Sequence, residues 1–398
     1  MNKEYTHLII GSGIIGLAMA RAIFFNQPKS KIIIIDKEKT EGCHASGRNS
    51  GVLHSGFYYT SDSLKAKFTV EGNRHLKEFC RQHHIPVNEC GKLVVAQNED
   101  EVETLYELER RGQKNGCHIK IIEEAQAREL EPNVKTHQKA LYAPDTASVD
   151  PLVICQTLKN TLFDHGVEFS FDTKYLSHRK NVIQTDKGEF HTAFVINCAG
   201  LYADRIARDF GFGQQYTILP FKGLYLKYTK NTTDIRMNIY PVPNLKNPFL
   251  GVHFTKTVTG QIKIGPTAIP VFWREQYDNS RFKWDEFWPI LGDQTRLLIT
   301  NAFGFRDLSF EEIKKYNKDY FIRLAQNMVL DIDPKGFSEY TLPGIRAQLL
   351  NKKSFELVQD FIIEGDHKSV HILNAVSPAF TCALPFSEYV LQKYLPKV

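Results

Sequence analysis

The first 40 residues constrain the fold most strongly, because they contain a complete strand, turn, helix and strand with glycines at the turn. The apolar run HLII leads into the turn GSGIIG at residues 11–16, an apolar helix-like run follows, and the strand-like KIIIID ends at Asp36. Glycines at these spacings let the backbone approach a pyrophosphate at a helix N-terminus, and an acid about twenty residues later can bind ribose hydroxyls. The pattern predicts a dinucleotide-binding unit on a parallel sheet.

The segment ASGRNSGVLHSGFYY, residues 45–59, stands where a nicotinamide enzyme would usually continue with another regular strand and helix. Its backbone N–H groups and hydroxyls can line the phosphates and then the ring of a longer cofactor, which favours FAD. The alternative is a surface loop. Because Val52, Leu53 and Phe57 would be poorly placed on such a loop, we interpret the segment as a cofactor cradle.

Composition excludes several classes of protein. A chain of 398 residues exceeds the size at which one hydrophobic core stops growing, so two domains are expected. The formal net charge of +5, from 50 Lys and Arg against 45 Asp and Glu, is mild and interspersed, which predicts no nucleic-acid partner. Seven scattered cysteines without a C-x-x-C pair favour neither a disulfide framework nor a zinc site. We therefore expect a cytoplasmic protein without a metal.

The rest of the chain alternates between two textures. Helices are expected near residues 63–83, 99–115, 151–165 and 284–330, with α/β alternation before and after the third of them. Residues 215–275 hold strands rich in Tyr, Phe, Val and Ile, which is typical of an antiparallel sheet. The pattern predicts an α/β domain with an antiparallel-sheet domain covering one face.

Several segments resemble one family of flavoproteins. The turn GSGIIG, the acid Asp36, the segment CHASGRNSGVLHSGFYY and the shorter GKLVVA, DPLVI, NCAG, PFLGVHFT, IGPTA, GIRAQ and NAVSPA are similar to those of the L-2-hydroxyglutarate oxidase/dehydrogenases, which are D-amino-acid-oxidase-like. The resemblance implies FAD-dependent oxidation of L-2-hydroxyglutarate to 2-oxoglutarate, by hydride transfer from the hydroxyl-bearing carbon to flavin N5. Electrons would pass to oxygen or a membrane quinone, and the small-molecule partner would be a dicarboxylate.

The fold implied by the resemblance agrees with the residue pattern. A discontinuous, Rossmann-like FAD-binding domain would comprise residues 1–85, 140–212 and 335–398, and an α+β substrate-binding domain residues 86–139 and 213–334. The tail NAVSPA replaces the glycine-rich turn of the broader superfamily and resembles the version found in the narrower group.

The expected FAD contacts come from the glycine turn, the end of the second strand, the cradle, the strand end NCAG and the tail. They are Gly11, Gly13, Ile14, Ile15, Gly16, Asp36, Lys37, His44, Ala45, Ser46, Arg48, Asn49, Ser50, Gly51, Val52, Ala199, Gly200, Ser377, Pro378 and Ala379. Within the cradle, the first half would lie along the diphosphate and the second half would turn under the flavin.

Oxidation of a 2-hydroxy acid needs a base for the hydroxyl proton. His253 stands on a predicted strand whose neighbours Val252 and Phe254 face the other way, and the resemblance favours it as base or substrate hydrogen-bond donor over a structural role. His54 is a second candidate for the same role. Alternatively, it contacts the flavin or is covalently attached to it.

The reaction also needs cations for two carboxylates. Arg346 follows a proline-glycine turn and could clamp a carboxylate by a two-pronged hydrogen bond, with an interdomain salt bridge as the alternative. The weaker candidates for the distal carboxylate and the hydroxyl are Tyr58, Tyr59, Lys222, Tyr240 and Arg274. At Lys222 the family pattern leads us to expect arginine, which makes a bidentate contact there doubtful.

Three tryptophans, at 273, 284 and 288, fall among other aromatic and basic residues. We interpret them as buried packing between sheet and helices. The alternative is a membrane-docking face through which a quinone enters, which would give the protein peripheral contact with the cytoplasmic face of the membrane.

Three other functions compete with the one implied by the resemblance. A glycerol-3-phosphate-type enzyme usually has arginine where this chain has Tyr58, and an amino-acid oxidase differs only in acting on an amine. A non-catalytic flavin-binding protein would need no cationic pocket, so Arg346 together with His253 argues against it.

Overall fold

The computed structural model describes residues 4–230, 235–245, 249–278 and 280–396. Residues 1–3 and 397–398 of the predicted FAD-binding domain, and 231–234, 246–248 and 279 of the predicted substrate-binding domain, lie outside the described residues.

The first sheet is built around the N-terminal strand. Its order is β21-β22-β11-β1-β2-β8, and β1 pairs in parallel with both β2 and β11. A hairpin of β9 and β10 extends β11. The strands are β1 (Glu4–Ile10), β2 (Ile32–Ile35), β8 (Glu168–Ser170), β9 (Tyr175–Arg179), β10 (Val182–Thr185), β11 (Gly188–Asn197), β21 (Ile363–Gly365) and β22 (Ser369–Ile372). The run of four isoleucines in β2 is fully buried, as a parallel strand covered on both faces requires.

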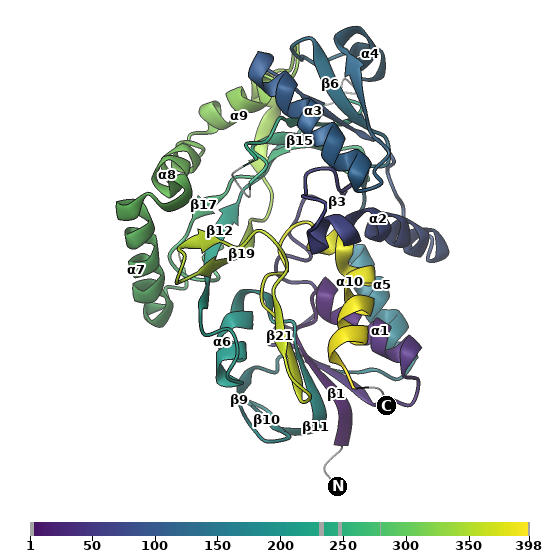
Figure 1. Ribbon diagram of the computed structural model, residues 1–398, viewed down its shortest axis with the longest axis vertical. Coiled ribbons are helices and arrows are strands. Elements are labelled where there is room, and N and C mark those ends of the chain that lie inside the picture. Colours follow the sequence, from purple (N-terminus) through teal and green to yellow (C-terminus); the bar gives the residue numbers. More distant parts are fainter. Residues whose placement is uncertain (1–3, 231–234, 246–248, 279, 397–398) are drawn as a thin grey trace.

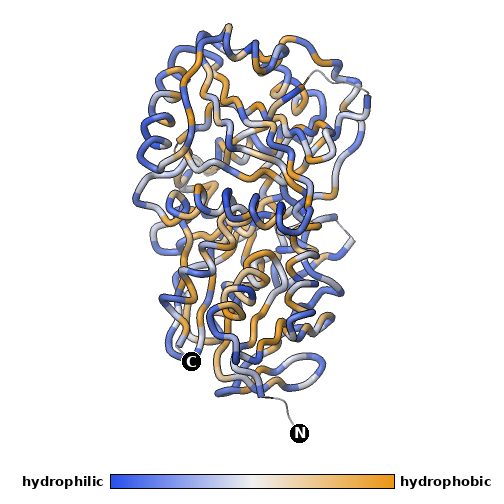
Figure 2. The backbone as a smooth tube through the Cα atoms, turned by 90° about the vertical axis from the view of Figure 1, so that its right-hand side faces the viewer, coloured by the Kyte–Doolittle hydropathy of each residue, from blue (hydrophilic) through white to orange (hydrophobic). Residues whose placement is uncertain are grey.

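Four helices pack against this sheet and one another in the lower right of Figure 1. They are α1 (Ile14–Asn26), α2 (Leu64–Gln82), α5 (Pro151–Asp164) and α10 (Ala379–Tyr394). Their apolar faces form one buried cluster with β1, β2 and β22. Figure 2 shows hydrophobic stretches gathered in the interior of the molecule and hydrophilic ones along its outside.

The second sheet is largely antiparallel, in the order β18-β13-β16-β15-β14-β4-β6-β5, with one parallel pairing between β14 and β4. Its strands are β4 (Lys92–Val95), β5 (Lys120–Glu123), β6 (Lys139–Ala143), β13 (Leu226–Tyr228), β14 (Asn238–Pro241), β15 (His253–Lys256), β16 (Ile262–Gly265) and β18 (Phe337–Tyr340). The helices α3 (Glu99–Lys114), α4 (Glu124–Leu130) and α9 (Lys318–Gln326) stand beside it.

A third sheet, with the order β17-β12-β19-β20, combines strands of both predicted domains. Its strands are β12 (Tyr216–Gly223), β17 (Ile269–Pro270), β19 (Gly344–Asn351) and β20 (Glu356–Leu357). The helices α7 (Trp284–Thr300) and α8 (Phe305–Lys314) form the left flank in Figure 1, and α6 (Ala203–Asp209) lies below this sheet. A two-stranded pair of β3 (Val52–Leu53) and β7 (Ala147–Ser148) anchors the cradle. Short 3-10 turns are η1 (Gly200–Tyr202), η2 (Ala302–Gly304) and η3 (Pro334–Gly336).

The architecture confirms the predicted fold class, an α/β dinucleotide-binding unit with an antiparallel-sheet part. The exact division stays a prediction, and four strand pairings cross it. Strands β18 and β19, assigned to the cofactor domain, pair with β13 and β12 of the other part. Strand β6, assigned almost wholly to the cofactor domain, pairs with β4 and β5.

Candidate functional site

One cavity of about 1640 Å³ runs between the sheets. It begins at the carboxyl ends of β1 and β2, passes along the cradle and the start of α10, and ends against β14, β15 and β19. Ligands of open α/β sheets bind at the carboxyl ends of the strands, so the cavity lies where a dinucleotide is expected.

The turn between β1 and α1 has the backbone that a pyrophosphate site needs. Gly11 has φ +106°, and a Cβ there would lie 2.6 Å from the Cys198 carbonyl oxygen. A Cβ on Gly16 would lie 1.9 Å from the Gly11 oxygen, so both positions require glycine. The N-terminus of α1 has no side chain of its own as a cap, and the backbone N–H of Ile14 donates to Ser46 Oγ at 2.9 Å.

Asp36 holds this turn together. Its Oδ2 accepts hydrogen bonds from the backbone N–H and the hydroxyl of Ser12, each at 2.6 Å. Its side chain also borders the cavity, which leaves the predicted contact with ribose compatible with the structure.

Most predicted cofactor contacts border this cavity. They are Gly11, Gly13, Ile14, Ile15, Asp36, Lys37, His44, Ala45, Ser46, Arg48, Asn49, Ser50, Val52, Ala199, Gly200, Ser377, Pro378 and Ala379. Gly16 and Gly51 do not border it, because both pack against backbone instead. The cavity volume, the residues that border it and the glycine turn at the start of α1 together fit FAD.

Gly51 is the residue at which the cradle enters β3. Its φ is +77°, and a Cβ there would lie 2.4 Å from the Val149 carbonyl oxygen. We expect Gly51→Ala to lower the melting temperature and the FAD content of the purified protein, because a strained left-handed residue costs about 1–3 kcal/mol before the clash is added. Gly116→Ala is the matched control, with φ +73° and no atom within 4 Å of its Cβ. Equal losses in the two variants would contradict a specific role for the cradle.

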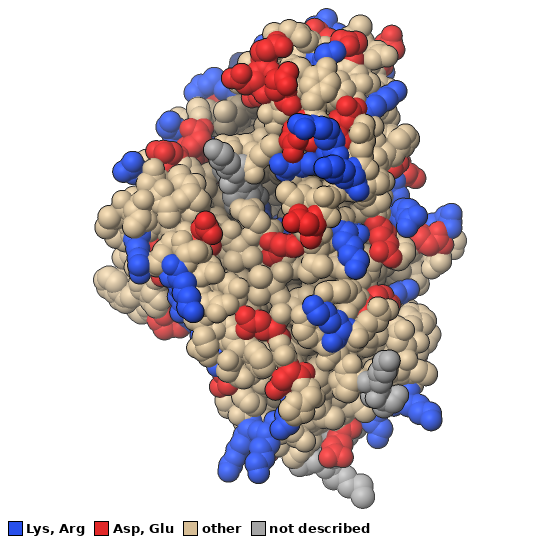
Figure 3. All heavy atoms as spheres, in the orientation of Figure 1, with Lys and Arg blue, Asp and Glu red and all other residues tan. Residues whose placement is uncertain are grey.

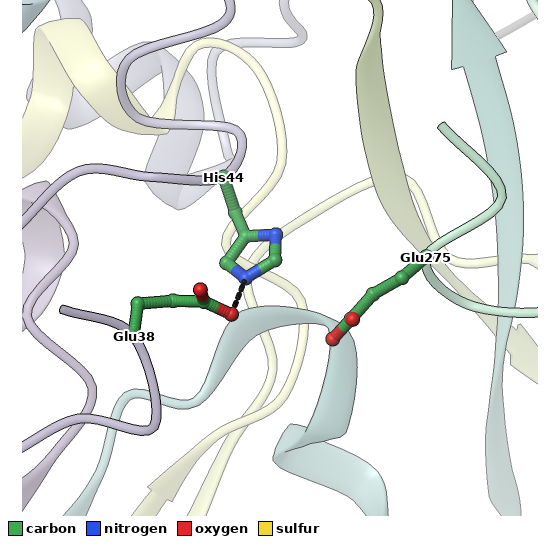
Figure 4. A group of neighbouring side chains, drawn as sticks. All are labelled: Glu38, His44 and Glu275. Atoms are coloured by element: carbon green, nitrogen blue, oxygen red, sulfur yellow. Dashed lines mark hydrogen bonds and ion pairs between the residues drawn. The ribbon is translucent and has the colours of Figure 1, made fainter. Parts of the chain in front are cut away.

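A cluster of Glu38, His44 and Glu275 lies at the edge of the cavity (Figure 4). His44 Nε2 lies 2.9 Å from Glu38 Oε1, and its Nδ1 lies 2.5 Å from the Tyr277 hydroxyl. The Lys37 ammonium, which ion-pairs with both carboxylates and lies 2.7 Å from Glu275, already supplies the cation of this cluster. The cluster therefore ties the cradle to the segment before α7, and the Lys37 ammonium balances the charge of its two carboxylates.

His253 and His54 both border the far end of the cavity. His253 Nδ1 lies 3.0 Å from the Gly251 carbonyl oxygen, and since a carbonyl only accepts, Nδ1 carries the proton. Its buried Nε2 has no hydrogen-bond partner among the described residues. Burial, reinforced by the positive charge of Lys92, lowers the pKa of His253 to about 3. His253 is therefore a neutral imidazole whose Nε2 can accept a proton.

His54 is held differently. Its backbone N–H donates to Thr381 Oγ1 at 3.1 Å, and its buried Nδ1 has no partner among the described residues. Burial, together with Lys92 and then His253, lowers the pKa of His54 well below its ordinary value. Nothing in the described surroundings of His54 selects one of its two ring tautomers.

The predicted tyrosines reach the same end of the cavity. Tyr58, Tyr59 and Tyr240 all border it, and the Tyr240 ring stacks on His253 with centroids 3.6 Å apart. The buried Tyr58 hydroxyl has no hydrogen-bond partner among the described residues. These side chains shape the pocket around the two imidazoles.

Arg346 borders the cavity from β19. Its Nε donates to Gln348 Oε1 at 3.1 Å, and its guanidinium lies 5.0 Å from the centre of the Phe249 ring. Burial lowers the pKa of Arg346 to about 10, so it stays charged at neutral pH. The predicted cation is present at the site.

Two of the predicted substrate cations, Lys222 and Arg274, do not border the cavity. The prediction for Lys222 is wrong because strand β12 places the neighbours Phe221 and Gly223 at the cavity and turns the Lys222 side chain to the opposite face. The prediction for Arg274 is wrong because its guanidinium does not border the cavity. It is buried in a two-pronged ion pair with Asp204, at 2.6 and 2.9 Å. That pair ties α6 to the segment before α7.

Two buried lysines at the site, Lys65 and Lys92, were not among the predicted residues. Lys65, on the first turn of α2, borders the cavity beside Arg346, and burial lowers its pKa to about 7. Lys92, at the start of β4, lies behind the wall formed by Tyr58 and Tyr240. A lysine leading the apolar run LVV was a signal for the second, whereas Lys65 stands in an ordinary amphipathic helix pattern.

The interpretation of the tryptophans as buried packing holds for Trp273 and is wrong for the other two. Trp284 is 66% exposed and Trp288 is 62% exposed, because they lie on the outer face of α7. No helix in the described part of the chain is long and apolar enough to cross a membrane. Basic and acidic side chains are mixed over the face shown in Figure 3.

The chain matches the family model described as FAD dependent oxidoreductase over residues 7–375. It is 33% identical to the L-2-hydroxyglutarate dehydrogenase of Escherichia coli (strain K12), over 98% of this chain and 93% of the relative. It is 32% identical to the mitochondrial L-2-hydroxyglutarate dehydrogenase of Homo sapiens, over 97% and 87%.

Solved structures show the same fold at lower identity. An L-alpha-glycerophosphate oxidase from Mycoplasma pneumoniae with FAD bound superposes with a TM-score of 0.76, at 21% identity over 98% of this chain and 95% of the other. A glycine oxidase from Geobacillus kaustophilus superposes with a TM-score of 0.70, at 16% identity over 98% and 94%.

Proposed function

This chain belongs to the FAD-dependent oxidoreductases and, within them, to the L-2-hydroxyglutarate dehydrogenase family, and we propose that it oxidises L-2-hydroxyglutarate to 2-oxoglutarate. The observation that carries this proposal is the single cavity in which an FAD cradle meets a neutral histidine and a buried arginine. Bound FAD would supply the hydride acceptor, the flavin N5 atom.

His253 is proposed as the base that accepts the hydroxyl proton. Its tautomer is set by the hydrogen bond from Nδ1–H to the Gly251 oxygen, which leaves the lone pair on Nε2. His54, whose tautomer no described contact selects, is proposed to contact the flavin or the substrate. The tyrosines Tyr58 and Tyr59 and the stacked Tyr240 exclude water from this end of the cavity.

Arg346 and Lys65 are proposed to bind the two carboxylates. Arg346 can donate two parallel hydrogen bonds to the planar carboxylate beside the hydroxyl. Lys65 lies close enough for the charge of Arg346 to lower its pKa, and the two carboxylates of the bound substrate would relieve that repulsion. The pair replaces Lys222 and Arg274 as the cationic part of the site.

Anaerobic mixing of the FAD-loaded protein with candidate substrates tests the function. L-2-Hydroxyglutarate is expected to bleach the flavin, whereas glycerol-3-phosphate and amino acids such as glycine leave it oxidised. A protein whose flavin is bleached by one of the latter and not by L-2-hydroxyglutarate would contradict the proposal. A flavin that no candidate bleaches would favour the non-catalytic alternative.

We propose that the protein is cytoplasmic, that electrons leave to oxygen or to a membrane quinone, and that the outer face of α7 makes the peripheral membrane contact. Trp284, Trp288 and the 42%-exposed Phe282 form an exposed aromatic surface. Arg281 and Lys283, beside them, border the cavity, so a quinone held at this surface would lie near the cavity edge. Aromatic side chains with basic neighbours are typical of interfacial contacts.

The double variant Trp284→Ser, Trp288→Ser is expected to lose binding to vesicles of phosphatidylethanolamine and phosphatidylglycerol, because two interfacial anchors are removed. Its turnover with a soluble quinone analogue should equal that of the wild type, since neither side chain borders the cavity. Phe163→Ser, which removes an aromatic side chain 61% exposed on α5, is the control and should still bind vesicles. Sedimentation with vesicles measures the difference, and equal sedimentation of the double variant and the wild type would contradict the proposed contact.

A further inference from the structure

Lys92 is buried, and the part of the chain that the structure describes offers its ammonium no counter-ion. Its side chain is fully buried at the start of β4, and its Nζ has no hydrogen-bond partner among the described residues. Three aromatic rings surround the ammonium instead: the ring centres of Phe57, Tyr58 and Tyr240 lie 5.6, 5.2 and 4.0 Å from Nζ. These rings attract the cation by their faces.

Such an arrangement is costly for the fold. An ammonium removed from water without a carboxylate loses most of its hydration, and aromatic faces restore only part of it. An apolar side chain of the same length would fill the same space without this cost. The lysine is therefore expected to serve something other than stability.

Two of the aromatic rings around Lys92 also form a wall of the reaction site. Tyr240, the ring closest to the ammonium, is stacked on His253 at 3.6 Å with an interplanar angle of 14°. Tyr58 borders the cavity beside His54. The cation thus lies one aromatic layer behind the two imidazoles.

The other titratable groups packed around these residues leave Lys92 as the dominant nearby charge. They are Tyr58 and Tyr59 from the cradle, Cys90 before β4, Tyr225 before β13, Tyr240 from β14 and Lys263 from β16, and no carboxylate is among them in the described part of the chain. After burial, Lys92 is the largest cause that lowers the pKa of His54 and that of His253. Burial lowers the pKa of Lys92 itself to about 7.

We propose that Lys92 is a positioning residue for the reaction: its ammonium, enclosed by aromatic rings, holds the Tyr58 and Tyr240 wall in place and supplies a positive charge one aromatic layer behind His54 and His253, where a substrate hydroxyl delivers its proton. This inference rests on the proposed function. The dianionic substrate offsets the charge of Lys92 when it binds, so that the base becomes able to hold a proton only in the complex.

The direction of the pH effect follows from these groups. Lys92 is charged below about pH 7, so it is charged throughout the acid range in which His253, with its pKa of about 3, takes a proton. With the charge present, the base of the free enzyme stays unprotonated into the acid range. Without it, protonation of the base begins at higher pH, and kcat/KM falls there because this ratio reports the free enzyme.

The test is the pH profile of kcat/KM for L-2-hydroxyglutarate from pH 3 to pH 7, where Lys92 is charged and where His253, with its pKa of about 3, takes a proton, in the wild type, Lys92→Met and Lys92→Arg. The methionine variant removes the charge and keeps the shape, and its acid limb is expected to move up by about one pH unit, which lowers kcat/KM about tenfold at a fixed pH on that limb. The arginine variant keeps the charge and is expected to retain the wild-type limb. Titration of the substrate carboxylates is common to all three proteins and cancels from the comparison.

Flavin content and melting temperature are measured on the same samples. The methionine variant should bind FAD fully and melt at the same or a higher temperature, since a buried unpaired cation has been removed. An unmoved acid limb, or a loss of folding or of FAD in the methionine variant, would overturn the inference and make Lys92 a structural residue. A wild type that does not turn over L-2-hydroxyglutarate would instead contradict the proposed function.

Discussion

His253→Ala is expected to slow flavin reduction by L-2-hydroxyglutarate about 10²- to 10⁴-fold while FAD stays bound, because a positioned base contributes a rate factor of that size. The expectation rests on the fixed tautomer of His253, whose Nδ1–H donates to the Gly251 oxygen and whose Nε2 has no partner among the residues described. Residual turnover should remain, since the cationic pocket and the cofactor are untouched. Stopped-flow absorbance under anaerobic conditions measures the step directly.

His54→Ala and Tyr240→Phe are the companion variants. Loss of His54 should have a smaller effect on the reduction rate than loss of His253, and Tyr240→Phe, which keeps the stack on His253, should have the smallest. If His54→Ala were the slower of the two alanine variants, the base would be His54. If neither slowed the reaction, proton acceptance by an imidazole at this site would be refuted.

Arg346→Met is expected to lower kcat/KM for L-2-hydroxyglutarate by about 10²- to 4 × 10³-fold. Removal of one partner from a buried ion pair costs about 3 to 5 kcal/mol, and each 1.4 kcal/mol is about a factor of ten in rate. Arg346→Lys keeps the charge but loses the planar fork, so an intermediate value is expected. Steady-state kinetics with FAD content measured in parallel separates this loss from a loss of cofactor.

A shorter substrate shows which carboxylate Arg346 and Lys65 each bind, and Arg274→Met is a control variant outside the cavity. With L-2-hydroxybutyrate, which lacks the distal carboxylate, Arg346→Met should lose as much as with L-2-hydroxyglutarate, whereas Lys65→Met should lose only with the longer substrate. Arg274→Met should lower the melting temperature instead, because it removes the two-pronged ion pair of the buried Asp204 and leaves it the longer ion pair with Arg208, at 3.2 Å. An Arg346→Met enzyme that is reduced at the wild-type rate would contradict the carboxylate clamp.

Features encoded in short stretches of chain were predictable from the sequence. The helices near residues 63–83, 99–115 and 151–165 appear as α2, α3 and α5, and His253 stands on a strand whose neighbours Val252 and Phe254 are buried in the core. These elements follow from periodicity and from turn chemistry, which depend on neighbours in the chain. The exact domain division does not, since β18 and β19 pair with strands more than 100 residues away.

The sequence by itself determined that this chain builds a dinucleotide site. Positive φ at Gly11, the packing of Gly16 against it and the acid at the end of β2 are local demands that only certain residues meet. The tertiary structure decided which charges serve that site. Lys222 and Arg274 look like ligands in the sequence and are turned to another face or paired with Asp204, because orientation depends on segments brought together only by folding.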